Sequence, residues 1–285
     1  MTRRIAGIIG RPVAHSLSPV FQSAAFAAHG LDVSYELWDT TNEALAGRIV
    51  SLRDPKYLGA NVTIPHKEAV LPFLDELGGQ SARVGAVNTI VNREGRLFGF
   101  NTDGPGFVAA LKNESYFEPA SKRILLVGAG GAARGIAFAL AAGNPEAITI
   151  WNRNPARATA LAAEVAATGA SVTAAHTAAA SPVGYDLIVN CTSVGMHGTG
   201  TEADLPCPID GTSPTALFVD IVYAPEETAL LRAATAAGHK TLGGLPMLIY
   251  QGALAFELWT GVPAPVDVMF EAARKSLAER ARSQQ

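Results

Sequence analysis

The chain has 285 residues, which is enough for one large domain or two of ordinary size. Hydrophobic residues make up 48% and charged residues 16%, so there is ample apolar material for a core and no sign of intrinsic disorder. The 22 Lys and Arg residues nearly balance the 25 Asp and Glu residues, without runs of like charge. This balance excludes the basic surface of a nucleic-acid binder or of a polybasic membrane-surface protein.

Mean hydropathy is slightly positive at +0.20. The two most apolar stretches, 124–140 and 242–262, are interrupted by charged or polar residues and lack the roughly 18–20 apolar residues of a spanning helix. The apolar run after Arg3-Arg4 is shorter than a signal-peptide core of about 7–15 residues. Cys191 and Cys207 form neither a metal-ligand spacing nor a disulfide framework. We expect a cytoplasmic protein without a metal site.

In the first part of the chain, short β-rich runs alternate with helical segments, as in βαβ units. Strands are predicted over 5–10, 33–38 and 59–64, and helices over 18–30, 44–52 and 65–77. A hairpin around Glu94-Gly95 is predicted between 86–92 and 97–100. A further helix follows 103–106 and ends near Lys112, and the polar stretch 113–122 is the predicted linker.

Beyond residue 122 the alternation is stricter. Strands are predicted over 123–127, 147–151, 171–174, 187–190, 217–220 and 240–242. Helices are predicted over 132–142, 155–168, 226–237, 246–259 and 267–281. This order is typical of an α/β fold with a parallel sheet.

The glycine-rich sequence after the strand over 123–127 carries the strongest single motif. Gly128, Gly130 and Ala133 form a G-x-G-x-x-A pattern between a strand and a helix. In such sites the first glycine allows a tight turn, the second lets the backbone approach a pyrophosphate, and the third small residue packs helix on strand. The context favours a dinucleotide site; a methyltransferase, a flavin site and a purely structural turn are the alternatives.

The end of the next predicted strand indicates which dinucleotide binds. An NAD-preferring site usually has Asp or Glu there to hold the ribose hydroxyls, but this sequence has Asn152, Arg153, Asn154 and then Arg157. Arginines meet a 2′-phosphate through forked, charge-assisted hydrogen bonds. These residues favour NADP, and the alternative is a pair of solvated arginines beside a helix start.

Four polar residues in the first part of the chain are candidates for chemistry, and three of them also have a structural alternative. Lys67 is predicted in the first helical turn after Pro65, as a proton donor or an ordinary exposed lysine. Asp103 can be a helix cap or a turn residue. Ser18 is predicted to cap a helix, which leaves Ser16 unexplained, and a helix start with two hydroxyls can also hold a carboxylate.

Taken together, these residues resemble the signature blocks of the shikimate dehydrogenase family. The matching blocks are 10–19 (GRPVAHSLSP), 61–67 (NVTIPHK), 85–89 (GAVNT), 99–104 (GFNTDG), 128–132 (GAGGA), 152–153 (NR), 190–196 (NCTSVGM), 220–225 (DIVYAP), 243–248 (GGLPML) and 251–253 (QGA). They follow one another from about residue 5 to residue 260, so the resemblance is far more specific than any single motif.

The resemblance implies an α/β fold with a Rossmann-type NADP domain over 105–245 and a discontinuous α/β substrate domain over 1–104, completed by 246–285. A cleft between the two would hold the substrate. The implied reaction is the NADPH-dependent, reversible reduction of 3-dehydroshikimate to shikimate, a step toward chorismate and the aromatic amino acids. We expect no nucleic-acid or membrane partner, and a monomer or homodimer.

The resemblance also implies roles for individual residues. Lys67 would be the general acid/base and Asp103 its partner. The substrate carboxylate would contact Ser16 and Ser18. The other groups of the substrate would contact Asn61, Thr63, Lys67, Asn88, Asp103, Tyr223 and Gln251. NADP would contact Gly128, Ala129, Gly130, Gly131, Ala132, Asn152, Arg153, Asn154, Arg157, Thr192, Ile221, Gly244 and Met247. Asn154 departs from the family, which usually has threonine there, so one hydroxyl that can contact the 2′-phosphate is absent.

Other functions stay open at this point. A quinate/shikimate dehydrogenase using NAD would differ in pocket shape around the two serines and Thr63, although Arg153 argues against NAD. A catalytically silent NADP-binding regulator would have no chemical need for both Lys67 and Asp103. Another two-domain NADP enzyme, such as a folate dehydrogenase, would not require the Ser-Leu-Ser and Asn-Thr-Asp blocks.

Overall fold

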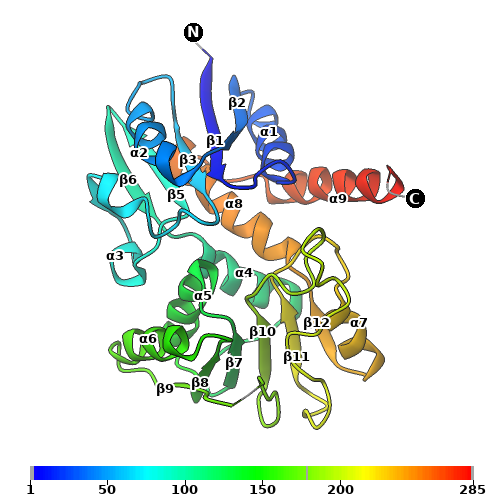
Figure 1. The fold of residues 1–285 in the computed structure, drawn as a ribbon. Helices are drawn as coiled ribbons and strands as arrows, with labels where there is room; N and C mark the ends of the chain where they lie inside the picture. Colours follow the sequence, from blue (N-terminus) through cyan, green and yellow to red (C-terminus); the bar gives the residue numbers. More distant parts are fainter. Residues whose placement is uncertain (1–2, 178, 284–285) are drawn as a thin grey trace. The chain divides into compact units, whose positions relative to one another are not determined.

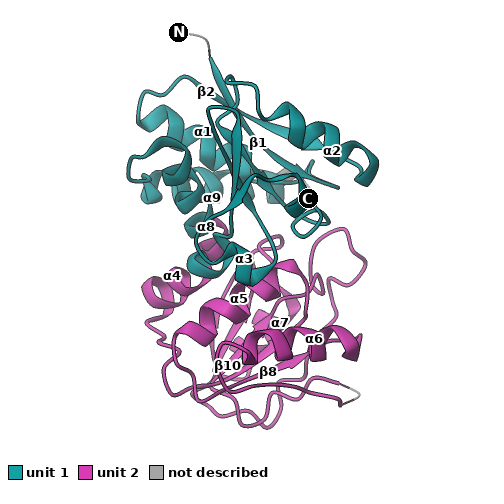
Figure 2. Ribbon diagram, turned by 90° about the vertical axis from the view of Figure 1, so that its left-hand side faces the viewer, with its two compact units in different colours: residues 1–106, 249–285 teal, residues 107–248 magenta. Residues whose placement is uncertain are grey.

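The structure, a computed structural model, describes residues 3–177 and 179–283 (Figure 1). The chain divides into two compact units, unit 1 over residues 1–106 and 249–285 and unit 2 over residues 107–248 (Figure 2). Both divisions fall inside helices, α4 (Asp103–Ser115) and α8 (Leu245–Thr260). The predicted linker over 113–122 therefore lies within unit 2 and does not separate the units.

A six-stranded mixed sheet in the order β2-β1-β3-β5-β6-β4 forms the centre of unit 1. Its strands are β1 (Arg4–Gly10), β2 (Val33–Asp39), β3 (Gly59–Val62), β4 (Glu76–Leu77), β5 (Thr89–Arg93) and β6 (Arg96–Phe100). β1 pairs parallel with β2 and β3, whereas β5 pairs antiparallel with β3 and β6. The predicted hairpin between β5 and β6 is confirmed.

Segments from opposite ends of the sequence pack together in unit 1. Its helices are α1 (Ser18–Ala28), α2 (Asn42–Ser51), α3 (Ser81–Val84), the start of α4, most of α8 and α9 (Val266–Ser283). Gln22 Nε2 on α1 donates to the Gly252 carbonyl at 2.8 Å, and Trp259 Nε1 donates to the Ile90 carbonyl at 2.9 Å. These bonds hold α8 against α1 and the sheet.

The prediction of a helix over 65–77 is wrong. The segment forms turns, a single 3-10 turn over Leu71–Phe73 and then strand β4. Pro72 lacks the N–H that a continuing helix needs, and Leu74 is already extended at φ −97° and ψ 145°. Lys67 accordingly lies in a turn and not in the first turn of a helix.

A parallel sheet in the order β12-β11-β10-β7-β8-β9 forms the centre of unit 2. Its strands are β7 (Arg123–Val127), β8 (Ala147–Trp151), β9 (Val172–Ala174), β10 (Leu187–Asn190), β11 (Leu217–Asp220) and β12 (Lys240–Leu242). This is the strand order of the doubly wound dinucleotide-binding fold, in which ligands bind where the order reverses, here between β7 and β10. The predicted parallel α/β architecture is confirmed.

Two helices of unit 2 begin directly after a residue whose side chain caps them, Asn154 and Thr228. The helices of this unit are α5 (Gly131–Ala142), α6 (Pro155–Ala166) and α7 (Ala229–Ala236), besides most of α4. α7 was predicted from residue 226 but starts three residues later, because the buried Thr228 hydroxyl accepts the N–H of Leu231 at 3.4 Å.

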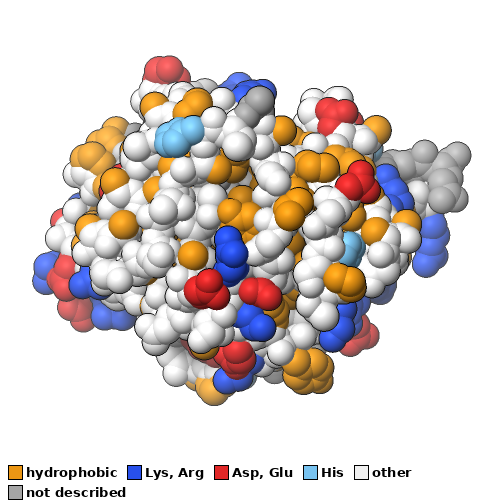
Figure 3. All heavy atoms as spheres, turned by 90° about the horizontal axis from the view of Figure 1, so that it is seen from below, with side chains coloured by type: hydrophobic (Ala, Val, Ile, Leu, Met, Phe, Trp, Pro, Cys, Tyr) orange, Lys and Arg blue, Asp and Glu red, His pale blue; other side chains and the backbone are white. Residues whose placement is uncertain are grey.

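The face of the molecule in Figure 3 carries mixed charge. On this face, acidic and basic side chains lie interspersed among hydrophobic and uncharged atoms. None of the helices in the described part of the chain is long and apolar enough to cross a membrane. Over the same residues, no group of three or more His, Cys, Asp or Glu side chains is arranged to hold a metal ion.

Candidate active site

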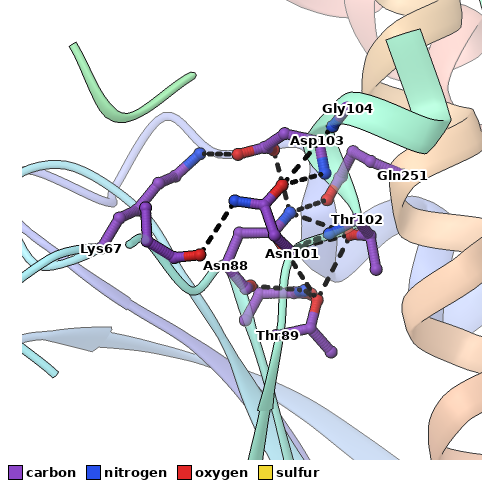
Figure 4. A network of polar contacts seen from close by, with 10 residues as sticks. Lys67, Asn88, Thr89, Asn101, Thr102, Asp103, Gly104 and Gln251 are labelled. Carbon is purple, nitrogen blue, oxygen red and sulfur yellow. Dashed lines mark hydrogen bonds and ion pairs between the residues drawn. The ribbon is translucent and has the colours of Figure 1, made fainter. Parts of the chain in front are cut away.

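Four of the predicted site residues meet in unit 1 (Figure 4). Lys67 Nζ donates to Asp103 Oδ2 at 2.5 Å. Asn88 Nδ2 lies 2.9 Å from Asp103 Oδ1 and 3.2 Å from Gln251 Oε1, to both of which it donates. The residues come from the turn after β3, the chain before β5, the first turn of α4 and α8. Folding thus brings distant parts of the sequence into one hydrogen-bonded cluster.

The ion pair of Lys67 and Asp103 is shielded from solvent. The two side chains are 13% and 6% exposed. Because less water surrounds it, this pair is screened less than a surface salt bridge. Asp103 also occupies the first turn of α4, where the helix dipole favours a carboxylate. Within the described chain Asp103 is the only partner of Lys67 Nζ, so this three-donor ammonium retains N–H groups for a further oxygen.

Asn88 fixes the position of the Asp103 carboxylate. Its Oδ1 accepts the main-chain N–H of Thr102 at 2.7 Å, which orients the amide so that Nδ2 faces Asp103. Asn88 is 2% exposed. The side chain therefore serves mainly to hold its neighbours, and the carboxylate is oriented from two sides, by Lys67 and by Asn88.

Asn61 is placed behind this cluster. Its Oδ1 accepts the hydroxyl of Tyr35 at 2.7 Å, while its Nδ2 donates to the Asn88 carbonyl and to Thr89 Oγ1, both at 3.2 Å. Tyr35 carried no motif and was missed by the sequence analysis; only its inward position on β2 could have indicated it. Burial raises the pKa of the Tyr35 phenol far above its ordinary value, so the phenol stays a donor.

The helix start that carries the two serines differs from the prediction. The N-cap of α1 is Leu17, which makes no side-chain cap, and Ser18 is the first helical residue. It is Ser16 that caps, because its Oγ accepts the Ser18 N–H at 3.1 Å. Ser18 is buried and Ser16 is half-buried. Thr63, half-buried, lies directly after β3.

In unit 2, the glycine turn has the geometry of a phosphate cradle. Gly128 has φ +120°, and a Cβ there would lie 3.0 Å from the Cys191 carbonyl oxygen, so only glycine fits. At Gly130 the reason differs: φ is −92°, and no protein atom lies within 4 Å of where a Cβ would be. The open space beside the start of α5 leaves room for a phosphate at the helix N-terminus. Ala129 completes the turn, and Gly131 and Ala132 begin α5.

The end of β8 presents two arginines without carboxylate partners. Arg153 and Arg157 are exposed, and neither forms a salt bridge with any residue the structure describes. Asn154 caps α6, its Oδ1 accepting the Ala156 N–H at 3.1 Å, and Asn152 Nδ2 donates to the Asn154 carbonyl at 2.9 Å. The residue that departs from the family therefore has a structural role, and the two free guanidinium groups suit a 2′-phosphate.

A buried carboxylate orders the loop after β10. Asn190 Oδ1 accepts the N–H and the hydroxyl of Thr192 at 3.0 and 2.6 Å, and Asn190 Nδ2 donates to Asp220 Oδ1 at 2.9 Å. Thr228 Oγ1 donates to Asp220 Oδ2 at 2.7 Å. Burial raises the pKa of Asp220 to about 6, although these hydrogen bonds lower it in part. Thr192 is thus held in place at the reversal of strand order.

The remaining predicted residues also lie in unit 2. A Cβ on Gly244 would lie 2.3 Å from the Ile221 carbonyl oxygen, so backbone packing already requires glycine there. Met247 is buried in the first turns of α8. Tyr223 belongs to unit 2, whereas the other predicted substrate residues belong to unit 1; its role stays a prediction.

Together, the fold and the two sites define a class of protein. One unit has the strand order, glycine turn and free arginines of a Rossmann-type dinucleotide-binding domain. The other has a shielded Lys–Asp pair suited to moving a proton. This combination is that of a dinucleotide-dependent dehydrogenase with a separate substrate-binding unit.

Comparison with known proteins identifies the family. Residues 8–90 match the shikimate dehydrogenase substrate binding domain, residues 110–226 match shikimate / quinate 5-dehydrogenase, and residues 244–274 match the shikimate 5'-dehydrogenase C-terminal domain. Shikimate dehydrogenase (NADP(+)) of Moorella thermoacetica is 43% identical over 96% of this chain and 93% of that protein. The chain belongs to the shikimate dehydrogenase family.

Solved structures agree in fold. Shikimate 5-dehydrogenase from Thermus thermophilus in complex with NADP(H) and shikimate has a TM-score of 0.84 and 43% identity, over 95% of this chain and 99% of that one. Quinate dehydrogenase from Corynebacterium glutamicum in complex with NAD also has a TM-score of 0.84, but only 30% identity, over 94% of this chain and 98% of that one.

Proposed function

We propose that the protein catalyses the NADP-dependent, reversible interconversion of shikimate and 3-dehydroshikimate. The observation that carries the proposal is the shielded Lys67–Asp103 pair, held at 2.5 Å inside a network of oriented amides. The names of the relatives point to the same reaction. A silent regulator would not need a buried ion pair, because a buried pair is costly to desolvate and weak as a stabilising device.

The residues of unit 2 fit the cofactor. The glycine turn offers N–H groups and open space to the pyrophosphate, and Arg153 and Arg157 offer donors to the 2′-phosphate. When bound, NADP(H) supplies or accepts the hydride. We assign cofactor binding to residues 105–245, with Asn152, Thr192, Ile221, Gly244 and Met247 as the further contacts.

The residues of unit 1 handle the proton and hold the ring. In reduction, the ketone oxygen gains negative charge as its carbon receives hydride. Lys67 stabilises that oxygen and donates a proton to it, which completes the alcohol; in oxidation Lys67 Nζ takes the proton back. Asp103 keeps the ammonium in place, and Asn88 keeps Asp103 in place.

The other substrate contacts divide by chemistry. We assign the carboxylate to Ser16 and Ser18 and the ring hydroxyls to Thr63 and Gln251. Asn61 has its side chain bonded on both sides within the protein, so we assign it the positioning of Asn88. The substrate-binding region comprises 1–104 and 246–285. We expect the enzyme in the cytoplasm as a monomer or homodimer.

A matrix of four assays tests the proposal. Shikimate and quinate are each offered with NADP⁺ and with NAD⁺, and nicotinamide reduction is followed by absorbance. We expect the fastest turnover with shikimate and NADP⁺, because the end of β8 has arginines and no carboxylate for the ribose hydroxyls. Faster oxidation of quinate with NAD⁺ would establish a quinate/shikimate dehydrogenase that uses NAD. No turnover in any of the four assays would refute the proposal that the protein is an enzyme of this kind.

A further inference from the structure

The first three residues of α1, where we assign the substrate carboxylate, have no spare backbone donor. The Ser18 N–H is bonded to Ser16 Oγ, Pro19 has no N–H, and the Val20 N–H is bonded to the Leu17 carbonyl at 3.0 Å. A helix N-terminus normally binds an anion through free N–H groups. Here the serine hydroxyls remain, and they are neutral.

A cation from the far end of the chain lies on this same loop. Arg280 Nη1 donates to the His15 carbonyl at 2.7 Å, and Arg280 Nη2 lies 3.4 Å from the Ser16 carbonyl oxygen, to which it also donates. Arg280 is on α9, which packs against α1 within unit 1. No sequence motif marks this residue, because the loop and the arginine are 264 residues apart.

We propose that Arg280 is a positioning residue for the carboxylate subsite: it holds the His15–Ser16 backbone and brings a positive charge to the loop that carries Ser16 and leads into Ser18. The guanidinium is planar and forked, so one side chain can fix two successive carbonyl groups. Its charge also supplies the attraction for an anion that neutral hydroxyls lack. This inference rests on the proposed function, since it assumes that the ligand carries a carboxylate.

The test compares a charged ligand with an uncharged one. Dissociation constants of shikimate and of its methyl ester are measured by calorimetry with wild type, Arg280→Ala, Arg280→Lys and Arg282→Ala. Arg282 is the matched control, since it is exposed on the same helix and makes no hydrogen bond or ion pair with any described residue. Circular dichroism melting checks that each variant is folded.

For Arg280→Ala we expect shikimate affinity to fall about 5- to 20-fold, as for loss of a charge-assisted contact, and ester affinity to change less than about 2-fold. Arg280→Lys keeps the charge but cannot fork across two carbonyls, so its shikimate affinity should be intermediate. Arg282→Ala should bind both ligands as wild type does.

Two results with Arg280→Ala would overturn the inference. Equal loss for acid and ester in Arg280→Ala would mean that Arg280 has only a structural role, and unchanged shikimate affinity would mean that it has none at the subsite. Both can occur while wild type turns over shikimate with NADP⁺, in which case the proposed function stands. Wild type that binds shikimate no more tightly than its ester also refutes the inference, whatever the turnover.

Discussion

Replacing Lys67 by Met removes the ammonium while keeping most of the apolar stem. Two effects should follow from the shielded pair, in which Lys67 is 13% and Asp103 is 6% exposed. Turnover should fall about 10²- to 10⁴-fold, the usual contribution of a positioned acid–base group. The free energy of unfolding should fall by about 3–5 kcal/mol, because a carboxylate is left buried without its cation.

A second substitution separates the two effects. In Lys67→Met/Asp103→Asn no buried charge is left unpaired, so we expect most of the stability to return while turnover stays low. Initial rates of NADP⁺ reduction measure the first effect and urea unfolding the second. NADP⁺ affinity, measured by calorimetry, should stay within about twofold of wild type, since the proposed cofactor residues lie in unit 2. Turnover of Lys67→Met within about tenfold of wild type would refute the acid–base assignment.

Three more substitutions test other contacts. Arg153→Ala should weaken NADPH binding about 10- to 100-fold and leave NADH unchanged in fluorescence titrations; equal losses would contradict the phosphate contact. Tyr35→Phe should lower the free energy of urea unfolding by about 1–2 kcal/mol, through the lost bond to Asn61 Oδ1, and no change would contradict its role. The folded protein raises the pKa of Asp220 from 3.8 to about 6, so Asp220 binds its proton more tightly when the protein is folded. Its contribution to the free energy of unfolding therefore falls by about 3 kcal/mol as pH rises from 3.8 to about 6. Urea unfolding of wild type and Asp220→Asn is measured from about pH 4 to about pH 7. The stability of wild type relative to Asp220→Asn should fall by about this amount over the interval, and parallel profiles would refute it.

Much of unit 2 could be predicted from the sequence, because its signals are local. The glycine turn, the Asn-Arg sequence and the alternation of apolar strands with helices each lie within a short stretch of chain. The structure also explains residues for which the sequence pattern gives no reason, such as Gly244, which a close backbone contact requires to be glycine. Even Asn154, a departure from the family, finds an explanation only in the cap it forms.

Unit 1 was harder to predict because its contacts are distant in sequence. The segment after Pro65 resembled a helix start, yet Pro72 and pairing of β4 with β6 gave turns and a strand. Ser16 and Ser18 were identified as a pair, but which of them caps depends on where α1 begins. Tyr35 is far from the other site residues in sequence and joins them only in the folded structure, where its hydroxyl donates to Asn61 Oδ1.

The discontinuity of unit 1 has a consequence for biosynthesis. The ribosome makes residues 107–248 as one continuous stretch before residues 249–285, so unit 2 can fold without contacts from the C-terminal segment. Unit 1 must wait, because Gln22, Ile90 and Asn88 have partners on α8. A chain that terminated early at residue 248 would contain all of unit 2, but its catalytic cluster would lack Gln251 and the contacts that α8 makes with unit 1.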